Sequence, residues 1–386
     1  MLKILFIAAD PYMGGSSQSM FQLAKELKNL YGIAPIILMP IPRIKNRLNL
    51  AHKCREEGIP CFVEKYYGFK GKKNFKSYAK FLLNYLVFYP IILYKVRNVK
   101  VDIVHSNNST IDIGVFISHF KRAKHIWHLR ESGDLDFGLY SVFGSVYERF
   151  IYKFGSQFIA ISEFVKNRFS SVIPKDKIIL IYNGVVPPPI EFSSEHNNNP
   201  IKFVVVGSIQ PAKNQLEAIK ALAGLKREGY NVQLNIVGGI ANKNYIQIIN
   251  EYIKKENLSD SVVFWGECDN VAQILSGMDV GLMLSKNEAF GRVTVEYMLQ
   301  NLLVIATNTG ANCEIVEDGS TGYIYHIGYC EELAEKMKKC IDDNDKMMRI
   351  AANGKKFAMQ RFLSTENTRS VYMVYMRMLK KRNINN

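Results

Sequence analysis

The sequence has few of the features that mark disulfide-stabilised, metal-binding or membrane-spanning proteins. Its six cysteines form no C-x-x-C pair and no metal-type spacing with histidine, which favours reduced thiols and argues against a disulfide framework in a chain of 386 residues. The apolar opening, Leu2–Ala9, is short and lacks a basic n-region, so it predicts a buried strand and not a signal peptide. A dinucleotide fingerprint G-x-G-x-x-G is also absent, which disfavours an NAD-dependent oxidoreductase.

What the sequence does contain is the composition of a globular protein with sizeable cores: 48% hydrophobic and 22% charged residues. Short apolar runs alternate with helical patterns, which predicts α/β domains with parallel sheets. In the first half the expected strands are Leu2–Ala9, Pro35–Met39, Ile103–Ser106, His125–Leu129, Phe158–Ser162 and Ile178–Tyr182, and a helix is expected at Ser16–Leu30. In the second half the expected strands are Lys202–Val206, Val232–Val237, Val262–Trp265, Val280–Leu284 and Leu303–Ala306.

Between these halves, residues 186–200 are rich in Pro, Asn and Ser and have no periodicity, which indicates a linker. We therefore predict two doubly wound domains, at 1–187 and 201–362, joined by a linker at 188–200. The final stretch, 363–386, is expected to form a helix that packs back toward the first domain.

The formal charge of +15 is concentrated in one quarter of the chain. Residues 40–130 contain 18 Lys or Arg against 5 Asp or Glu, a net of +13. A solvated, lysine-rich surface and attraction to anionic lipid or a diphosphate-bearing acceptor both remain open; no nucleic-acid motif accompanies the charge. The apolar stretch Phe81–Tyr94 lies in the same quarter and is shorter than the about 20 residues of a membrane span. It is expected to be either a buried core helix or a surface that enters a bilayer interface.

Two segments of the second half carry the chemistry. The strand that ends at Gly207 leads through a loop to Lys213 at the next helix start, where a lysine can neutralise a diphosphate leaving group. The segment 285–298 follows another strand and begins a helix near Gly291, whose free backbone N–H groups would point at a phosphate. Two carboxylates, Glu288 and Glu296, flank this anion site.

The two glutamates could instead be the acid and nucleophile of a glycoside hydrolase. Eight helical residues rise about 12 Å, beyond the roughly 5–9.5 Å that hydrolase carboxylates need. Because Glu288 is expected ahead of the helix, the true distance is open at this stage. The spacing suits the two ends of a nucleotide-sugar better, with a hexose near Glu288 and ribose hydroxyls near Glu296.

This segment, with Ala-Phe-Gly-Arg between the two glutamates, resembles the hallmark of the retaining glycosyltransferases of family 4, which have the GT-B fold of two Rossmann-like domains facing a central cleft. Further segments extend the resemblance over nearly the whole chain. They are Gly14-Gly15 after the first strand, Ile161-Ser162-Glu163, Asn183-Gly184-Val185, the loop that contains Thr309-Gly310 and Glu314, and His128-Leu-Arg130-Glu131, which resembles the H-x-R-E segment of the polysaccharide-building branch.

The resemblance implies a role for each matching residue. Lys213 would bind the donor diphosphate, Glu288 the donor hexose and Glu296 the ribose, while His128 would lie near the anomeric centre. The residues implied as catalytic are His128, Lys213 and Glu288. The wider donor site would comprise Gly14, Gly15, Ser208, Lys213, Glu288, Ala289, Phe290, Gly291, Arg292 and Glu296, and Arg130 and Glu131 would lie in the acceptor region.

One position departs from the family pattern. The family often has an arginine directly after the glycine that matches Gly207, and here that residue is Ser208. A second cation such as Arg292 or Arg130 could contribute in its place; otherwise leaving-group stabilisation would be weaker, or the chain inactive. The pair Asp134 and Asp136 matches the D-x-D of metal-dependent transferases of another fold, but it lacks that single-domain context, and we expect no metal and no cofactor.

The sequence therefore predicts a retaining, metal-independent hexosyltransferase that uses a nucleotide diphosphate-sugar, with UDP favoured over GDP. The expected acceptor is a sugar, lipid-diphosphate-linked, in the synthesis of a bacterial surface polysaccharide. We expect a cytoplasmic protein at the inner face of the cell membrane, attracted to anionic lipid and not to nucleic acid. A non-catalytic nucleotide-sugar-binding subunit and a nucleotide-sugar 2-epimerase of related fold remain as alternatives.

Overall fold

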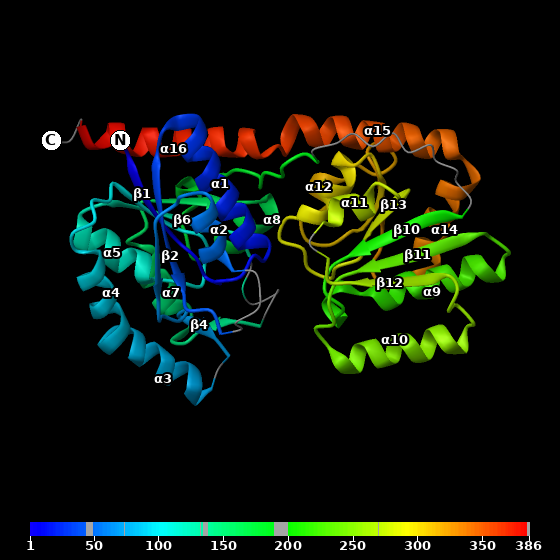
Figure 1. The fold of residues 1–386 in the computed structure, drawn as a ribbon, viewed down its shortest axis with the longest axis horizontal. Helices are drawn as coiled ribbons and strands as arrows, with labels where there is room; N and C mark the ends of the chain where they lie inside the picture. Colours follow the sequence, from blue (N-terminus) through cyan, green and yellow to red (C-terminus); the bar gives the residue numbers. More distant parts are fainter. Residues whose placement is uncertain are drawn as a thin grey trace. The chain divides into compact units, whose positions relative to one another are not determined.

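The computed structural model describes residues 1–43, 49–72, 74–131, 133, 138–188, 200–268 and 270–383. It divides into two compact units: unit 1 comprises Met1–Gly184 and Ser364–Asn386, and unit 2 comprises Val185–Leu363. Each unit is a parallel sheet with helices on both faces (Figure 1). Apart from its two end residues, the linker expected at 188–200 lies outside the described residues.

Unit 1 is built on a seven-stranded parallel sheet of order β3-β2-β1-β5-β6-β8-β9. Its strands are β1 (Lys3–Ile7), β2 (Ala34–Pro40), β3 (Cys61–Glu64), β5 (Ile103–Ser106), β6 (Lys124–Leu129), β8 (Gln157–Ala160) and β9 (Ile178–Leu180). Strand β1 is apolar after Lys3, as expected where helices cover both faces, whereas the central strands β5 and β6 also carry buried polar side chains: His105, Ser106, His125 and His128. Unit 1 also contains a separate antiparallel pair, β4 (Lys70–Gly71) with β7 (Tyr140–Ser141), which is not hydrogen-bonded to the seven-stranded sheet.

The helices of unit 1 bury two separate cores against this sheet. One core contains side chains of α1 (Gly15–Tyr31), α2 (Leu50–Glu56) and α16 (Ser364–Asn383), and the other contains side chains of α4 (Tyr89–Val96) and α5 (Ile113–Lys121). The remaining helical elements are α3 (Phe75–Leu83), the π-helical turn η1 (Asn84–Phe88), α7 (Gly144–Tyr152), α8 (Glu163–Phe169) and the 3₁₀ turn η2 (Lys175–Lys177).

The C-terminal helix α16 is part of unit 1 although 179 residues of unit 2 separate it from the rest of that unit. Tyr372 of α16 stacks on Tyr31 of α1 with ring centroids 4.0 Å apart. Thr368 donates a hydrogen bond of 2.6 Å to the buried carboxylate of Glu26. The last helix of the chain therefore completes the hydrophobic core of the first sheet.

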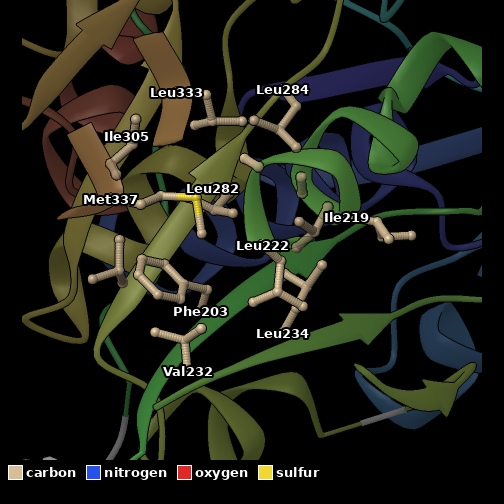
Figure 2. Close-up of a cluster of buried hydrophobic side chains, with 14 of the residues drawn as sticks. Phe203, Ile219, Leu222, Val232, Leu234, Leu282, Leu284, Ile305, Leu333 and Met337 are labelled. Carbon is tan, nitrogen blue, oxygen red and sulfur yellow. The ribbon is translucent and has the colours of Figure 1, made fainter. Parts of the chain in front are cut away.

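Unit 2 repeats the architecture with a six-stranded parallel sheet of order β12-β11-β10-β13-β14-β15. The strands are β10 (Ile201–Val206), β11 (Val232–Val237), β12 (Val262–Gly266), β13 (Val280–Met283), β14 (Leu303–Thr307) and β15 (Tyr323–Tyr325). The helical elements are η3 (Pro211–Lys213), α9 (Gln215–Arg227), α10 (Lys243–Lys255), α11 (Val271–Leu275), α12 (Arg292–Leu299), α13 (Asn312–Ile315), α14 (Cys330–Asp342) and α15 (Asn344–Arg361). Figure 2 shows part of its core, where Phe203, Leu234 and Leu282 of the sheet face Leu222 of α9 and Met337 of α14.

The predicted fold class is confirmed: both halves are doubly wound α/β units with parallel sheets. The sequence patterns missed the edge strands β3 and β15, which are three or four residues long. Four expected strands end early, at Ile7, Ala160, Leu180 and Met283. After β8, Ser162 is already the N-cap of α8, with its hydroxyl accepting a hydrogen bond from the Val165 amide. The apolar stretch at 81–94 is only partly buried: one side packs into the core of unit 1 and the other side is exposed. The expectation of a buried core helix therefore holds for one side alone.

Candidate active site

The sheet topology of unit 2 brings the two chemically informative loops together. Strand β10 pairs in parallel with β13, although β11 and β12 lie between them in sequence. The strand order therefore reverses beside β10, and ligands of doubly wound folds bind outside the carboxyl ends of the strands at such a point. The loop after β10 carries Lys213, and the loop after β13 carries Glu288.

These two side chains form an ion pair. The Lys213 Nζ lies 3.0 Å from Glu288 Oε2, and both side chains are partly exposed (31% and 19%). The Lys286 amide donates a 3.2 Å hydrogen bond to the Ala212 carbonyl, which joins the same two loops through their backbones. Lysine and glutamate are thus held at a common, solvent-accessible position at the end of the sheet.

The loop that carries Lys213 is shaped by buried polar contacts of α9. Its turn passes through Asn214 in the left-handed region (φ 56°), where asparagine is tolerated. Glu217 holds this turn: its carboxylate accepts hydrogen bonds from the Asn214 side chain and from the Gly328 amide at 2.8 Å. Burial is the main influence on the Glu217 carboxyl and raises its pKa.

A third loop, after β14, supports Glu288 from behind. The Ala311 amide donates a 2.8 Å hydrogen bond to the Glu288 carbonyl. Gly310 adopts φ 60°, and a β-carbon there would lie 2.3 Å from the Glu288 carbonyl oxygen, so only glycine fits. The sequence pattern included Gly310 in the resemblance but did not reveal this contact, because it joins loops that follow two neighbouring strands.

The start of α12 forms the anion-binding part of the site. Gly291 is its N-cap in the left-handed region (φ 88°), and as a glycine it supplies no side-chain cap to the first turn, the part of a helix that favours anions. The Arg292 Nε lies 2.8 Å from Glu296 Oε1 one turn along. Glu288 precedes the helix, as the sequence predicted. Phe290 is buried and packs against Phe362 with ring centroids 5.7 Å apart, while Ala289 is half-buried.

Ser208 brings no positive charge to the site. Its hydroxyl accepts a 2.9 Å hydrogen bond from the Gln210 side chain, and its carbonyl accepts one of 3.0 Å from Gln215. Gly207 has φ 151°, which leaves the chain free to turn directly out of β10. Of the two other cations considered from sequence, Arg292 lies at the helix start beside Glu296, and Arg130 belongs to unit 1.

In unit 1, the expected residues lie at the carboxyl ends of β1 and β6. Gly14 is the N-cap of α1 and Gly15 its first residue; a β-carbon at either would meet no atom within 4 Å. Neither the backbone angles of Gly14 nor its packing demand a glycine, so the open space there is available to a ligand. Glu131 follows β6 and is partly exposed.

His128 and Arg130 lie in a buried polar network at the end of β6. The Arg130 Nε donates a 2.6 Å hydrogen bond to Asn107, and its guanidinium also bonds to Asn183. His128 Nδ1 lies 3.3 Å from Arg130 and 3.2 Å from His105 Nε2. Burial is the main cause that lowers the pKa of both histidines, and the positive charge of Arg130 lowers it further, so both rings are neutral.

Within the described residues no group of three or more His, Cys, Asp and Glu side chains could hold a metal ion. The D-x-D pair, Asp134 and Asp136, lies outside them.

Two family descriptions match the chain: "Glycosyltransferase Family 4" over residues 13–187 and "Glycosyl transferases group 1" over residues 186–357. Among curated proteins, the capsular polysaccharide biosynthesis glycosyltransferase CapM of Staphylococcus aureus is 27% identical over 57% of this chain and 62% of its own length. An uncharacterised glycosyltransferase of Methanocaldococcus jannaschii is 25% identical over 90% of both chains. N-acetyl-alpha-D-glucosaminyl L-malate synthase of Bacillus anthracis is 25% identical over 46% of both. The chain thus spans less than two thirds of the length of two of these three relatives.

Solved structures match over almost the entire chain. HepE of Anabaena, crystallised with UDP, superposes with a TM-score of 0.82 at 22% identity, covering 97% of this chain and 100% of that one. A glycosyltransferase of Rickettsia africae superposes with a TM-score of 0.80 at 22% identity, covering 98% and 99%. At this identity the likeness establishes the fold, which is the GT-B architecture of glycosyltransferases. With two family descriptions that together run from residue 13 to residue 357, the chain belongs to the family 4 glycosyltransferases.

Proposed function

We propose that the chain transfers a hexose from a nucleotide diphosphate-sugar, a UDP-sugar first among them, to a sugar acceptor. The observation that carries this proposal is the pairing of Lys213 with Glu288 at 3.0 Å beside the start of α12. A cation and a helix N-terminus suit a diphosphate, and an adjacent carboxylate suits sugar hydroxyls. These are the parts that a nucleotide-sugar site needs.

The proposed chemistry follows from where negative charge develops. As the bond between the anomeric carbon and the diphosphate breaks, charge grows on the leaving phosphate. Lys213 would move from Glu288 to that phosphate, and the first amides of α12 would donate to it. Glu288, released from the lysine, would accept hydrogen bonds from the hexose, and Glu296 from the ribose.

Arg292 is our candidate for the cation that Ser208 does not supply. It is the first residue of α12, and its partner Glu296 is the carboxylate proposed for the ribose. The guanidinium therefore lies between the proposed phosphate and ribose positions, and its planar fork of N–H donors suits phosphate oxygens. Retention at the anomeric carbon and independence of metal are part of the proposal, and both rest on the family resemblance.

The relatives support a nucleotide-sugar donor and a polysaccharide product. HepE of Anabaena was crystallised with UDP, with UDP and glucose, and with UDP-glucose. CapM of Staphylococcus aureus carries the name of a capsular polysaccharide biosynthesis enzyme. We extend both features to this chain: a UDP-sugar as donor and a growing bacterial surface polysaccharide, lipid-diphosphate-linked, as acceptor.

A cavity of about 550 Å³ in unit 1 is our candidate for the acceptor's charged part. It opens after β1 and β2, and its lining includes Arg43, Lys65, Tyr12 and Tyr67. Two cations and tyrosine hydroxyls suit phosphate and sugar hydroxyls. Lys65 also lies 5.1 Å from the ring centre of Phe88 in η1, so the cavity adjoins the apolar stretch that follows α3.

That stretch has the surface of a protein that contacts lipid. The continuous helical segment Phe75–Val96 is long and apolar enough to cross a membrane, and only 28% of its most apolar part is buried. Phe75, Leu86 and Tyr94 are 85%, 74% and 65% exposed. On α7, which packs beside α3 through Phe81 and Tyr147, Val146 is 78% exposed. We name as the apolar–basic face the exposed residues Phe75, Lys76, Lys80, Leu82, Leu83, Leu86, Val87, Ile91, Tyr94, Lys95, Arg97, Val146, Arg149, Phe150 and Lys153.

We propose that this face rests on an anionic membrane at its cytoplasmic side and brings the cavity close to lipid-linked acceptors. Apolar side chains would enter the interface while lysine and arginine neutralise lipid headgroups. The opposite signs of protein and lipid charge favour lipid over a second copy of this basic face as the partner.

Transfer assays on the purified chain test the proposal. Thermal-shift screening against UDP-, GDP- and dTDP-sugars should first identify the donor, because a ligand that binds the folded state raises the melting midpoint. With that donor, Lys213→Ala and Glu288→Gln should each lower turnover by about 100-fold, the loss typical of one electrostatic contact to a transition state. Lys220→Ala removes an exposed lysine of α9 and serves as the matched control. Near-normal turnover in either site variant would overturn the assignment.

A further inference from the structure

Unit 1 contains a chain of buried polar side chains that runs from the C-terminal helix to His128. Tyr375 of α16 lies with its hydroxyl 2.6 Å from His105 Nδ1, and His105 Nε2 lies 3.2 Å from His128 Nδ1. All three side chains are fully buried. Three sequence-distant elements, α16, β5 and β6, each contribute one member.

Arg130 and Tyr375, at the two ends of this row of side chains, together set the direction of its hydrogen bonds. A guanidinium can only donate, so its 3.3 Å contact with His128 Nδ1 favours that nitrogen as an acceptor. The nitrogen has a single lone pair, which Arg130 shares with His105, so the Arg130 contact alone does not fix the tautomer. With Nδ1 as the acceptor, the proton of a neutral His128 is on Nε2. Since His128 Nδ1 accepts, His105 must donate to it from Nε2, and a neutral His105 can only accept at Nδ1. The Tyr375 hydroxyl is left to donate to His105.

The end of this chain is an unused donor. Among the described residues, His128 Nε2 has no hydrogen-bond partner although it is buried. A buried N–H without an acceptor lowers the stability of the fold by about 1–3 kcal/mol. Such groups are rare in native proteins, and many of them serve a bound ligand or water. An acceptor oxygen from a bound ligand would remove the penalty.

We propose that Tyr375 is a positioning residue which, through His105, holds His128 in the Nε2–H tautomer, so that His128 presents an N–H donor to an oxygen of a bound ligand. His128 is then a neutral donor and not a base. The helix that supplies Tyr375 follows the whole of unit 2 in sequence, so completion of the His128 site requires the C-terminal segment. This inference rests on the proposed function only for the identity of the ligand; the tautomer itself follows from the geometry.

Other groups around the two rings support a neutral, fixed state. His125, also on β6, contributes to the electrostatic environment of His105, and burial lowers the pKa of His125 to about 3. Its Nε2 is occupied by the Ser106 hydroxyl at 2.9 Å, so it does not compete for His105. Asn107 and Asn183 hold the guanidinium of Arg130 in place. No carboxylate pairs with either ring among the described residues, and the neutral form is therefore favoured.

The test is the tautomer of His128 in the full-length protein, read by ¹⁵N NMR of histidine-labelled chain at pH 7.5. The wild-type protein should show His128 and His105 protonated at Nε2. Tyr375→Phe removes the donor to His105 Nδ1, so both rings should become mixtures of tautomers. Tyr372→Phe removes a hydroxyl from the same helix and should leave both rings unchanged. His105→Gln interrupts the hydrogen bonds between Tyr375 and His128 and should also give a mixture of His128 tautomers.

Turnover gives a second readout once a donor is known. Tyr375→Phe should lower kcat about fivefold, the effect of one neutral hydrogen bond, with little change in KM; the melting midpoint should also fall, because the buried His105 Nδ1 loses its partner. A wild-type His128 protonated at Nδ1, or a tautomer unaffected by both Tyr375→Phe and His105→Gln, would overturn the proposal. A chain that transfers no sugar but shows the expected tautomers would instead refute the proposed function and leave the hydrogen-bond chain intact.

Discussion

Gly310 shows at the scale of one residue how the donor site depends on close backbone packing. A β-carbon on Gly310 would lie 2.3 Å from the Glu288 carbonyl oxygen and 2.6 Å from its amide nitrogen. Gly310→Ala should therefore displace the Glu288 loop, lower the free energy of unfolding and weaken donor binding at least tenfold. Urea denaturation and donor titration measure the two effects separately.

Gly319→Ala is the matched control for this change. Gly319 also has a positive φ, 76°, but a β-carbon there would meet no atom within 4 Å. Both substitutions cost the strain of a left-handed alanine, about 1–2 kcal/mol, and only Gly310→Ala adds a collision. Equal losses of stability and equal donor affinities in the two variants would contradict the supporting role of Gly310.

Single residues also mark the limit of prediction from sequence. Lys213, Glu288 and Gly291 were singled out because each follows a strand or begins a helix, and that local setting is visible in the sequence. The network around His128 was not, because Tyr375 and His105 are 270 positions apart and meet only when α16 packs on the sheet. Contacts of that separation leave no periodic signal in one sequence.

At the scale of elements, the apolar–basic face should behave as a membrane contact. In vesicle sedimentation, the protein should bind anionic vesicles more tightly than neutral ones, and high salt should weaken that binding. Lys76→Glu with Lys80→Glu should lower affinity for anionic vesicles at least tenfold, since each basic residue contributes about 1 kcal/mol. Leu86→Ser with Val146→Ser should weaken binding to both kinds of vesicle.

The control for the apolar variant is Ile240→Ser, which removes a residue 59% exposed on unit 2 and should leave binding unchanged. Equal affinity for neutral and anionic vesicles would contradict the electrostatic part of the proposal. Protein that resists both high salt and alkaline extraction would indicate a spanning segment at Phe75–Val96 in place of a surface contact.

The regular elements were largely predictable because their physics is local. Parallel strands covered on both faces are mostly apolar runs, so β1, β10 and β14 stand out in the sequence. The edge strands β3 and β15 do not, since they are short and partly exposed. The exposure of Leu86 and its neighbours was equally hidden, because an apolar run looks the same whether it faces a core or solvent.

At the scale of the whole molecule, the histidines divide the chain electrostatically. His105, His125 and His128 are buried in unit 1, and burial lowers the pKa of each. In unit 2 the described histidine is His326, which is exposed and pairs with Glu332. Acid should therefore destabilise unit 1 more than unit 2.

The sign follows from proton linkage. A histidine whose pKa is lower in the folded state stabilises the fold above its ordinary pKa of about 6.5, and this stability is lost as the pH falls below that value. Each such group costs about 1.4 kcal/mol at pH 5.5, so the three together cost roughly 4 kcal/mol. Burial raises the pKa of Asp112, so this carboxyl acts in the opposite direction to the histidines.

The two tryptophans of the chain allow each unit to be observed alone. Trp127 is buried in unit 1, and Trp265 is half-exposed in unit 2. Urea unfolding of Trp265→Phe followed by Trp127 fluorescence should show a midpoint that falls steeply between pH 7.5 and pH 5.5. The reverse variant, Trp127→Phe, is unsuitable because it opens a cavity in the core of unit 1. The unit 2 transition is therefore obtained by subtracting the fluorescence of the Trp265→Phe variant from that of the wild-type protein, which leaves the signal of Trp265. Similar pH dependence of the two transitions, or a unit 1 midpoint that does not change, would show that the buried histidines accept protons without opening the fold.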